Sequence, residues 1–185
     1  MDVKVGISNR HIHLTKEDFI ILFGNDKTLT KRNDLYQEGE FACLETVTIK
    51  SNYSFIEKVR IIGPFRNYTQ VEISKTDSYF LKIDPPYRDS SFLSDASFIT
   101  IEGPKGRLEN KKCCIMPVRH IHVNSDDDHF VNGEKVSVKV SSEKGGILDN
   151  VYIKKGKSYK LELHLDTDDA NAFNLKNNDI VQIIK

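Results

Sequence analysis

Cysteine is scarce in this 185-residue sequence, and its odd number limits what it can do. The three cysteines are Cys43, Cys113 and Cys114. Adjacent cysteines rarely bond to each other, so the sequence gives no basis for a disulfide framework of the kind that staples small secreted domains. We therefore expect reduced thiols and a cytoplasmic protein.

Long apolar runs and an excess of one charge are also missing. Hydrophobic residues make up 38% of the chain without forming a run long enough for a transmembrane helix. Basic and acidic side chains balance at 27 each, which argues against nucleic acid or a membrane surface as a partner. The opening MDVKVGISNRH lacks the basic and apolar regions of a signal peptide. These absences leave a soluble globular protein.

Most of the sequence order consists of short segments that alternate apolar and polar residues, as strands with one buried face do. Turn signals such as Gly-Pro, Pro-Pro and Gly-Gly separate them. This punctuation favours a mainly β fold built from barrels over an open parallel sheet. The expected strands are 2–8, 43–50, 58–63, 70–74, 97–103, 135–140, 151–156, 160–165 and 179–184.

Three short helices are expected, each beginning at a residue that can cap it. Thr15 would cap the first, with Asp18 three residues on in the manner of a capping box. Ser125 would cap the segment SDDDHF, and Thr167 would cap TDDANAF.

The tetrapeptide R-H-I-H occurs twice, at 10–13 and at 119–122. Each copy lies between a strand signal and an expected capped helix, which indicates an internal duplication. The boundary between the two copies is expected near KKCCIMPV, residues 111–118, where no Gly/Ser-rich linker is present.

In a strand, residues two apart share a face, about 7 Å apart along the chain. His11 and His13 can therefore converge on one ion about 2 Å from each nitrogen, and so can His120 and His122. A single H-x-H is more often a hydrogen-bonded strand pair, but its repetition favours metal binding.

Further ligand candidates lie in other strands. His164 shares a strand face with Glu162, because the leucines between and beside them face the other way, and we favour it as a third ligand. Glu72 can be a ligand for the same reason, although an ordinary surface pair would also explain it. His129 follows three aspartates and is interpreted as solvated.

Arg66 follows a Gly-Pro turn, where a planar guanidinium can be presented to phosphate. Arg60 lies within a strand and is less able to do so. The pattern alone thus predicts two metal sites and an anion-binding arginine in a β-rich protein.

Six segments, in order, resemble a known family: SNRHIHL, RNDLYQEGEFACLETVTI, VRIIGPFRNYTQVEIS, IDPPYR, VRHIHV and LHLDTDDANA. Together they resemble the PduL-type phosphotransacylases, or phosphate propanoyltransferases, over nearly the whole chain. The resemblance implies two β-barrels with short capping helices, formed by residues 1–9 with 118–185 and by residues 10–117. It also implies that the two histidine pairs contribute to one dinuclear site near the junction of the barrels.

The same resemblance implies that the first zinc ion would be held by His11, His13 and Glu72. The second zinc ion would be held by His120, His122 and His164. Arg66 would be the catalytic arginine that binds phosphate. Cobalt or another divalent ion could replace zinc at such ligands.

The implied activity interconverts an acetyl- or propanoyl-CoA plus inorganic phosphate with acyl phosphate plus CoA. We expect direct attack of phosphate on the thioester, because Cys43 has no Cys/His setting and is interpreted as a buried thiol. Two alternatives stay open: a zinc-dependent acyl-CoA thioesterase, and a non-catalytic metal-stabilised β-barrel that only binds. The family suggests a homodimer. Its microcompartment members carry a targeting extension, and with none seen here we expect a free cytoplasmic enzyme.

Overall fold

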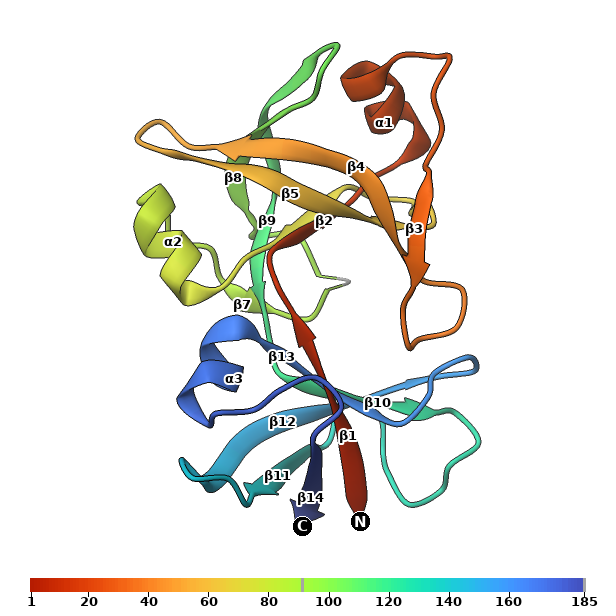
Figure 1. Cartoon of the computed structure of the whole chain (residues 1–185), viewed down its shortest axis with the longest axis vertical. Helices are drawn as coiled ribbons and strands as arrows, with labels where there is room; N and C mark the ends of the chain where they lie inside the picture. The colour runs from red at the N-terminus through yellow and green to blue at the C-terminus, as the bar shows by residue number, and fades with distance from the viewer. Residues whose placement is uncertain (91, 185) are drawn as a thin grey trace. The chain divides into compact units, whose positions relative to one another are not determined.

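The chain folds into two β-rich units, and the structure, a computed structural model, describes residues 1–90 and 92–184. One unit consists of Arg10–Pro117, and the other combines Met1–Asn9 with Val118–Lys185. Each contains a closed six-stranded barrel (Figure 1), and among the described residues the first unit has two short helices and the second has one. The expectation of a mainly β fold with two barrels is confirmed.

The barrel of residues 10–117 closes through six strands in the order β4, β5, β2, β6, β9, β8, because β8 pairs with both β9 and β4. Two further strands extend it, β3 beside β4 and β7 beside β9. The strands are β2 (His11–His13), β3 (Lys31–Asp34), β4 (Phe41–Lys50), β5 (Phe55–Gly63), β6 (Gln70–Glu72), β7 (Tyr87–Arg88), β8 (Ser97–Glu102) and β9 (Arg107–Pro117).

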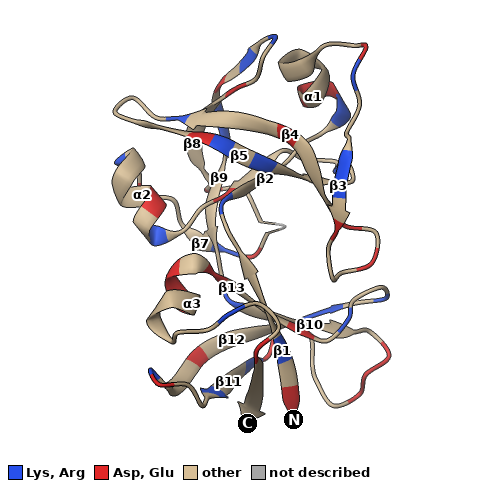
Figure 2. Ribbon diagram, viewed as in Figure 1, with Lys and Arg blue, Asp and Glu red and all other residues tan. Residues whose placement is uncertain are grey.

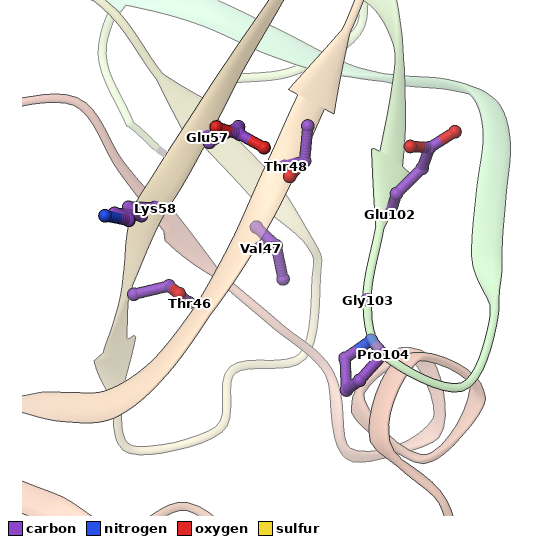
Figure 3. A pocket seen from close by; sticks show the side chains of 8 residues that line it. All are labelled: Thr46, Val47, Thr48, Glu57, Lys58, Glu102, Gly103 and Pro104. Carbon is purple, nitrogen blue, oxygen red and sulfur yellow. The ribbon is translucent and has the colours of Figure 1, made fainter.

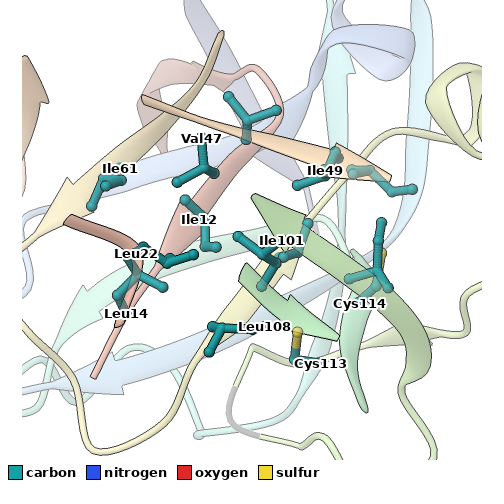
Figure 4. Packing of buried hydrophobic residues seen from close by; sticks show 14 of the residues in the cluster. Ile12, Leu14, Leu22, Val47, Ile49, Ile61, Ile101, Leu108, Cys113 and Cys114 are labelled. Carbon is teal, nitrogen blue, oxygen red and sulfur yellow. The ribbon is translucent and has the colours of Figure 1, made fainter. Parts of the chain in front are cut away.

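Aliphatic side chains from every side of this barrel fill its interior. Ile12 of β2 is fully buried between the two histidines of its strand, and it belongs to one cluster with Ile61 of the adjacent strand β5 and Ile101 of β8 (Figure 4). Because successive strand residues face opposite ways, burying Ile12 in the core turns His11 and His13 to the outer face of β2. The hydrophobic effect therefore sets the direction of the first histidine pair.

The second barrel closes in the order β1, β13, β10, β12, β11, β14. Its first strand lies at the start of the sequence: β1 pairs in parallel with β13 and antiparallel with β14. Ile121 is fully buried between its two histidines, as Ile12 is in the other barrel. The strands are β1 (Asp2–Ser8), β10 (His120–Asn124), β11 (Lys135–Val140), β12 (Gly146–Gly156), β13 (Glu162–Asp166) and β14 (Ile180–Ile184).

Three helices flank these strands, and they differ in part from the expected set. Helix α1 (Lys16–Phe23) begins after Thr15, whose hydroxyl accepts a hydrogen bond from the Asp18 amide at 3.1 Å. The expected reciprocal half of the capping box is not formed there, because the Asp18 carboxylate instead binds Thr69 and Lys111.

The other two helices depart further from the expected set. Helix α3 (Thr167–Ala172) is capped by Asp166, one residue before the expected Thr167, because the aspartate accepts the Asp169 amide. The segment after Ser125 forms turns instead of a helix, since it has too few apolar residues to pack. Helix α2 (Lys75–Leu81), capped by Ser74, was not expected.

Charged side chains of both signs are interspersed along both units (Figure 2). In the part of the chain that is described, no helix is both long enough and apolar enough to cross a membrane.

Candidate metal centres

The first candidate centre is built on neighbouring strands of the barrel of residues 10–117. Strand β2 pairs antiparallel with β6, and this register places Glu72 directly opposite His11. His13, two residues along β2, shares the face of His11. One candidate ligand atom from each of the three residues lies within 4.8 Å of the others. The structure therefore gathers His11, His13 and Glu72 into one cluster.

The second candidate centre repeats this arrangement in the other barrel. Strand β10 pairs antiparallel with β13, and His164 lies directly opposite His120. The ring centroid of His164 lies 5.0 Å from that of His120 and 4.2 Å from that of His122. These three histidines also offer ligand atoms within 4.8 Å of one another. In both barrels the first histidine of R-H-I-H thus faces the third candidate ligand.

Backbone carbonyls orient one ring in each histidine pair. Nδ1 of His13 lies 3.1 Å from the carbonyl oxygen of Ile62, and Nδ1 of His120 lies 2.8 Å from that of Val118. A carbonyl oxygen only accepts, so each Nδ1 carries the proton and donates it. The lone pair is then on Nε2, the arrangement common for histidines that hold metals.

The donor sets fit a catalytic type of zinc site. Three protein ligands, either two imidazoles with one carboxylate or three imidazoles, leave one of four tetrahedral positions for another molecule. The distance between His11 Nε2 and Glu72 Oε2 is 3.4 Å. Two ligands of a tetrahedral zinc ion, with bonds of about 2.0–2.1 Å, lie about 3.3–3.4 Å apart. The first centre therefore has the spacing that zinc requires along this edge.

The arginine of the first R-H-I-H ties its histidine strand to helix α2. Arg10 binds Asp77 through two contacts, Nε to Oδ2 at 2.9 Å and Nη2 to Oδ1 at 2.6 Å. Asp77 also closes a capping box with Ser74 at the start of the helix. Because α2 follows directly after the strand of Glu72, this clamp connects the two strands that carry the candidate ligands.

The second arginine makes the corresponding clamp. Arg119 donates from Nη2 to Asp169 Oδ1 at 2.8 Å and from Nη1 to the Asp149 carbonyl oxygen at 3.2 Å. Asp169 lies in helix α3, which follows the strand of His164.

Sequence spacing is the same in the two clamps. The candidate ligand, the helix cap and the clamped aspartate are Glu72, Ser74 and Asp77 in one barrel and His164, Asp166 and Asp169 in the other. The duplication therefore extends beyond R-H-I-H to the segments EISKTD and HLDTDD. Sequence reading missed these aspartates, and a comparison of the two segments could have found them.

A separate cavity of about 370 Å³ lies over strands β4, β5 and β8 (Figure 3). Its lining includes Thr46, Thr48, Glu57, Lys58 and Glu102, and it contains none of the six candidate ligands. Its threonines and opposed charges indicate an open polar surface. The candidate chemistry thus lies with the histidine clusters.

The sequence is similar to known proteins over nearly its whole length. A family model described as "Phosphate propanoyltransferase" matches residues 4–176. The chain belongs to the phosphate propanoyltransferase family. A relative of that name from Thermotoga maritima is 44% identical over 98% of this chain and 88% of its own length. Another from Rhodopseudomonas palustris is 41% identical over 99% of this chain and 82% of its own length. A third, from Clostridioides difficile, is 39% identical over 99% and 89%.

Proteins of the phosphate propanoyltransferase family are acyltransferases, so the expectation of an enzyme is confirmed. In this family member, Arg66 lies in the loop after β5, and its backbone amide donates to the carbonyl oxygen of Leu14 at 2.9 Å. Its guanidinium donates from Nη2 to Glu40 Oε1 at 3.0 Å. Because Leu14 follows His13 directly, the loop of Arg66 is attached to the strand of the first histidine pair.

The other residues considered in the sequence, Arg60, His129 and Cys43, make contacts that fit structural roles. Arg60 donates to the carbonyl oxygens of Cys43 and Leu44, so it braces strand β4. His129 is exposed and contacts Asp127 at 2.9 Å. Cys43 is fully buried, and burial raises the pKa of its thiol to about 11. A thiol with that pKa is almost entirely protonated near neutral pH and is a poor nucleophile.

Proposed function

We propose that this protein is a phosphate acyltransferase that interconverts a short-chain acyl-CoA and inorganic phosphate with acyl phosphate and CoA. The acyl group is acetyl or propanoyl, and one zinc ion is bound by each cluster. The observation that carries the proposal is the pair of three-ligand clusters in a chain of the phosphate propanoyltransferase family.

His11, His13 and Glu72 would hold one ion, and the three histidines of the second barrel would hold the other. Bound zinc would supply Lewis acidity toward an oxygen ligand and a partner for a thiolate, which is the metal-binding form of a thiol. Nitrogen and carboxylate donors would accept cobalt as well. The protein's contribution is to fix the ligands on strands whose register the core determines.

Arg66 is the proposed phosphate anchor. A guanidinium holds a phosphate through two parallel hydrogen bonds, which also lowers the repulsion between phosphate and a developing oxyanion. The contact with Glu40 keeps this guanidinium in place. Phosphate would compete with Glu40 for the same donors, so Glu40→Gln should favour phosphate binding.

The proposed reaction has no acyl-enzyme. A phosphate oxygen attacks the thioester carbonyl carbon, a C–O bond forms, and the tetrahedral intermediate breaks its C–S bond to release CoA as thiolate. A cysteine nucleophile is disfavoured by burial, which raises the pKa of Cys113 to about 12 and that of Cys114 well above its ordinary value. Holding both reactants in place removes much of the entropic cost of their encounter.

The test is release of free CoA from acetyl-CoA and propanoyl-CoA by zinc-loaded protein, with and without inorganic phosphate. We expect release only with phosphate, together with acyl phosphate in equal amount. Release without phosphate would assign a thioesterase. No release from folded, zinc-loaded protein would reduce the chain to a metal-binding barrel protein.

A matched pair of arginine variants tests the anchor. Arg66→Ala should raise the KM for phosphate far more than the KM for CoA, by about 10-fold or more, because a charge-assisted contact is lost. Arg107→Ala is the control, since Arg107 is exposed and pairs locally with Glu109. Equal changes in both KM values would remove Arg66 from this role.

A further inference from the structure

A fully buried glutamine lies beside the third candidate ligand of the first cluster. Gln70 is 0% exposed, lies two residues before Glu72 in β6 and faces His13 across the strand pair. Its Nε2 donates to Glu72 Oε1 at 2.8 Å. That bond occupies one carboxylate oxygen, and the other, Oε2, faces His11. Gln70 therefore selects which oxygen Glu72 can offer to an ion.

A buried carboxylate occupies the corresponding position in the second barrel. Glu162 is 6% exposed, lies two residues before His164 in β13 and faces His122 across the strand pair. His164 Nε2 lies 2.7 Å from Glu162 Oε2. When that nitrogen donates its proton to the carboxylate, the imidazole lone pair is on Nδ1. Glu162 therefore selects which nitrogen His164 can offer.

The neighbouring strand leaves room for this carboxylate. Gly6 of β1 pairs with His164, and a Cβ atom at Gly6 would lie 2.5 Å from Glu162 Oε1. A side chain there would displace Glu162. The glycine is thus part of the same arrangement.

The two partners are chemically complementary to their ligands. A carboxylate ligand needs a donor beside it, and Gln70 supplies an amide N–H. A histidine ligand needs an acceptor, and Glu162 supplies a carboxylate. Each cluster therefore includes one carboxylate. In the first cluster it is the candidate ligand Glu72. In the second it is Glu162, the partner of the candidate ligand His164.

The glutamine is not explained by packing. Its Oε1 is buried and has no hydrogen-bond partner among the described residues. Leaving a buried polar atom unpaired costs free energy, which an apolar side chain of the same size would avoid. The retained amide is accounted for by its bond to Glu72.

We propose that Gln70 and Glu162 are positioning residues, each matched to the metal ligand two positions further along its strand. Each divalent ion then receives one unit of carboxylate charge, directly from Glu72 or through the imidazole of His164. This inference rests on the proposed function, because it takes metal binding at both clusters as given.

The first test measures zinc affinity by competition with a chromophoric chelator. Gln70→Glu, in a His120→Ala/His122→Ala background that leaves only the first cluster, should weaken zinc binding about 10- to 100-fold, the usual loss for a partner of a ligand. Two adjacent carboxylates would then compete for one position. Glu162→Gln in a His11→Ala/His13→Ala background should cause a loss of the same order at the second cluster.

The second test is a rescue. Glu72→His alone should weaken zinc binding at the first cluster, because the Gln70 amide N–H would then face an imidazole. Adding Gln70→Glu copies the pairing of the second barrel and should restore affinity to within about 10-fold of the original. Substituting cobalt provides a visible spectrum that should return to a tetrahedral form in the double variant. A merely structural role would show no such rescue.

Outcomes separate the two proposals. Unchanged zinc affinity in Gln70→Glu and Glu162→Gln would overturn this inference and leave the proposed function standing. Failure of the unsubstituted protein to bind zinc would overturn the metal role in both. If Gln70→Glu does not fold by circular dichroism, Gln70→Met replaces it, since methionine fills the space without donating, and the same loss of affinity is expected.

Discussion

The two histidine clusters share a scaffold and differ in their third candidate ligand. In both barrels a buried isoleucine turns a histidine pair outward, the first histidine faces the third ligand, and an arginine clamps the helix that follows. The third candidate ligand is Glu72 in one cluster and His164 in the other. Two positions before it lies the amide side chain of Gln70 in the first cluster and the carboxylate of Glu162 in the second. The backbone arrangement is thus the same in both clusters. The carboxylate belongs to the candidate ligand in the first cluster and to the hydrogen-bond partner of the candidate ligand in the second.

Replacing the third candidate ligand should have the largest effect on metal content and activity. Glu72→Ala and His164→Ala should each reduce bound zinc from about two ions per chain to about one, with at least a roughly 100-fold loss of activity. Elemental analysis and the phosphate-dependent assay would measure both. Retention of two ions in either variant would remove that residue from the ligand set.

The two arginine clamps should differ in strength. Arg10→Ala leaves the buried Asp77 without its bidentate partner and should lower the unfolding free energy by about 2–4 kcal/mol. Arg119→Ala should cost less, about 1–2 kcal/mol, because Asp169 is more exposed and accepts a single contact from it. Urea denaturation would measure both values, and a reversed order would contradict the comparison.

Gly6→Ala should lower zinc affinity at the second cluster and leave the first unchanged. The added methyl group would displace Glu162 and weaken zinc binding at the second cluster by about 10-fold, while the first cluster keeps its affinity. Chelator competition would measure both affinities. As a control, Gly39 of the other barrel has no atom within 4 Å of an added Cβ. Its positive φ of 81° would make Gly39→Asn the suitable substitution there.

The cysteines should show the smallest effect on activity, although all three lie in the barrel of residues 10–117. The raised pKa of Cys43 reduces its thiolate fraction at every pH below about 11, so the folded protein should resist iodoacetamide at a pH of about 8. Cys43→Ala should change activity less than about twofold and stability by about 1 kcal/mol. A trapped acyl-cysteine would overturn the direct-attack reaction.

Sequence reading predicted the strands that alternate in polarity and missed those that do not. The segment 135–140 was expected as a strand and forms β11, with Val136, Val138 and Val140 buried. Strand β9 was missed, because its residues from Cys113 to Met116 are all buried and give a continuous run. Helix α2 was missed because Tyr79 and Phe80 are exposed, which obscures its apolar face.

The candidate site was predictable as a set of residue types and not as a set of contacts. Histidines two apart on a strand share a face whatever the fold, so each pair could be recognised locally. The alignment of Glu72 with His11 depends on the register between strands far apart in the sequence, and only the family resemblance implied it. Gln70 escaped notice because an isolated glutamine carries no pattern.

Strand β1 has a consequence for how the chain matures during synthesis. It is synthesised before residues 10–117, but it belongs to the barrel whose other strands are synthesised after them, where it lies between β13 and β14. Residues 10–117 contain every strand of their own barrel and can close as soon as they leave the ribosome. Residues 2–8 must wait, unpaired, until the final strand emerges. A partner or a fused tag that captured this segment early would leave the second histidine cluster unassembled while the first was already formed.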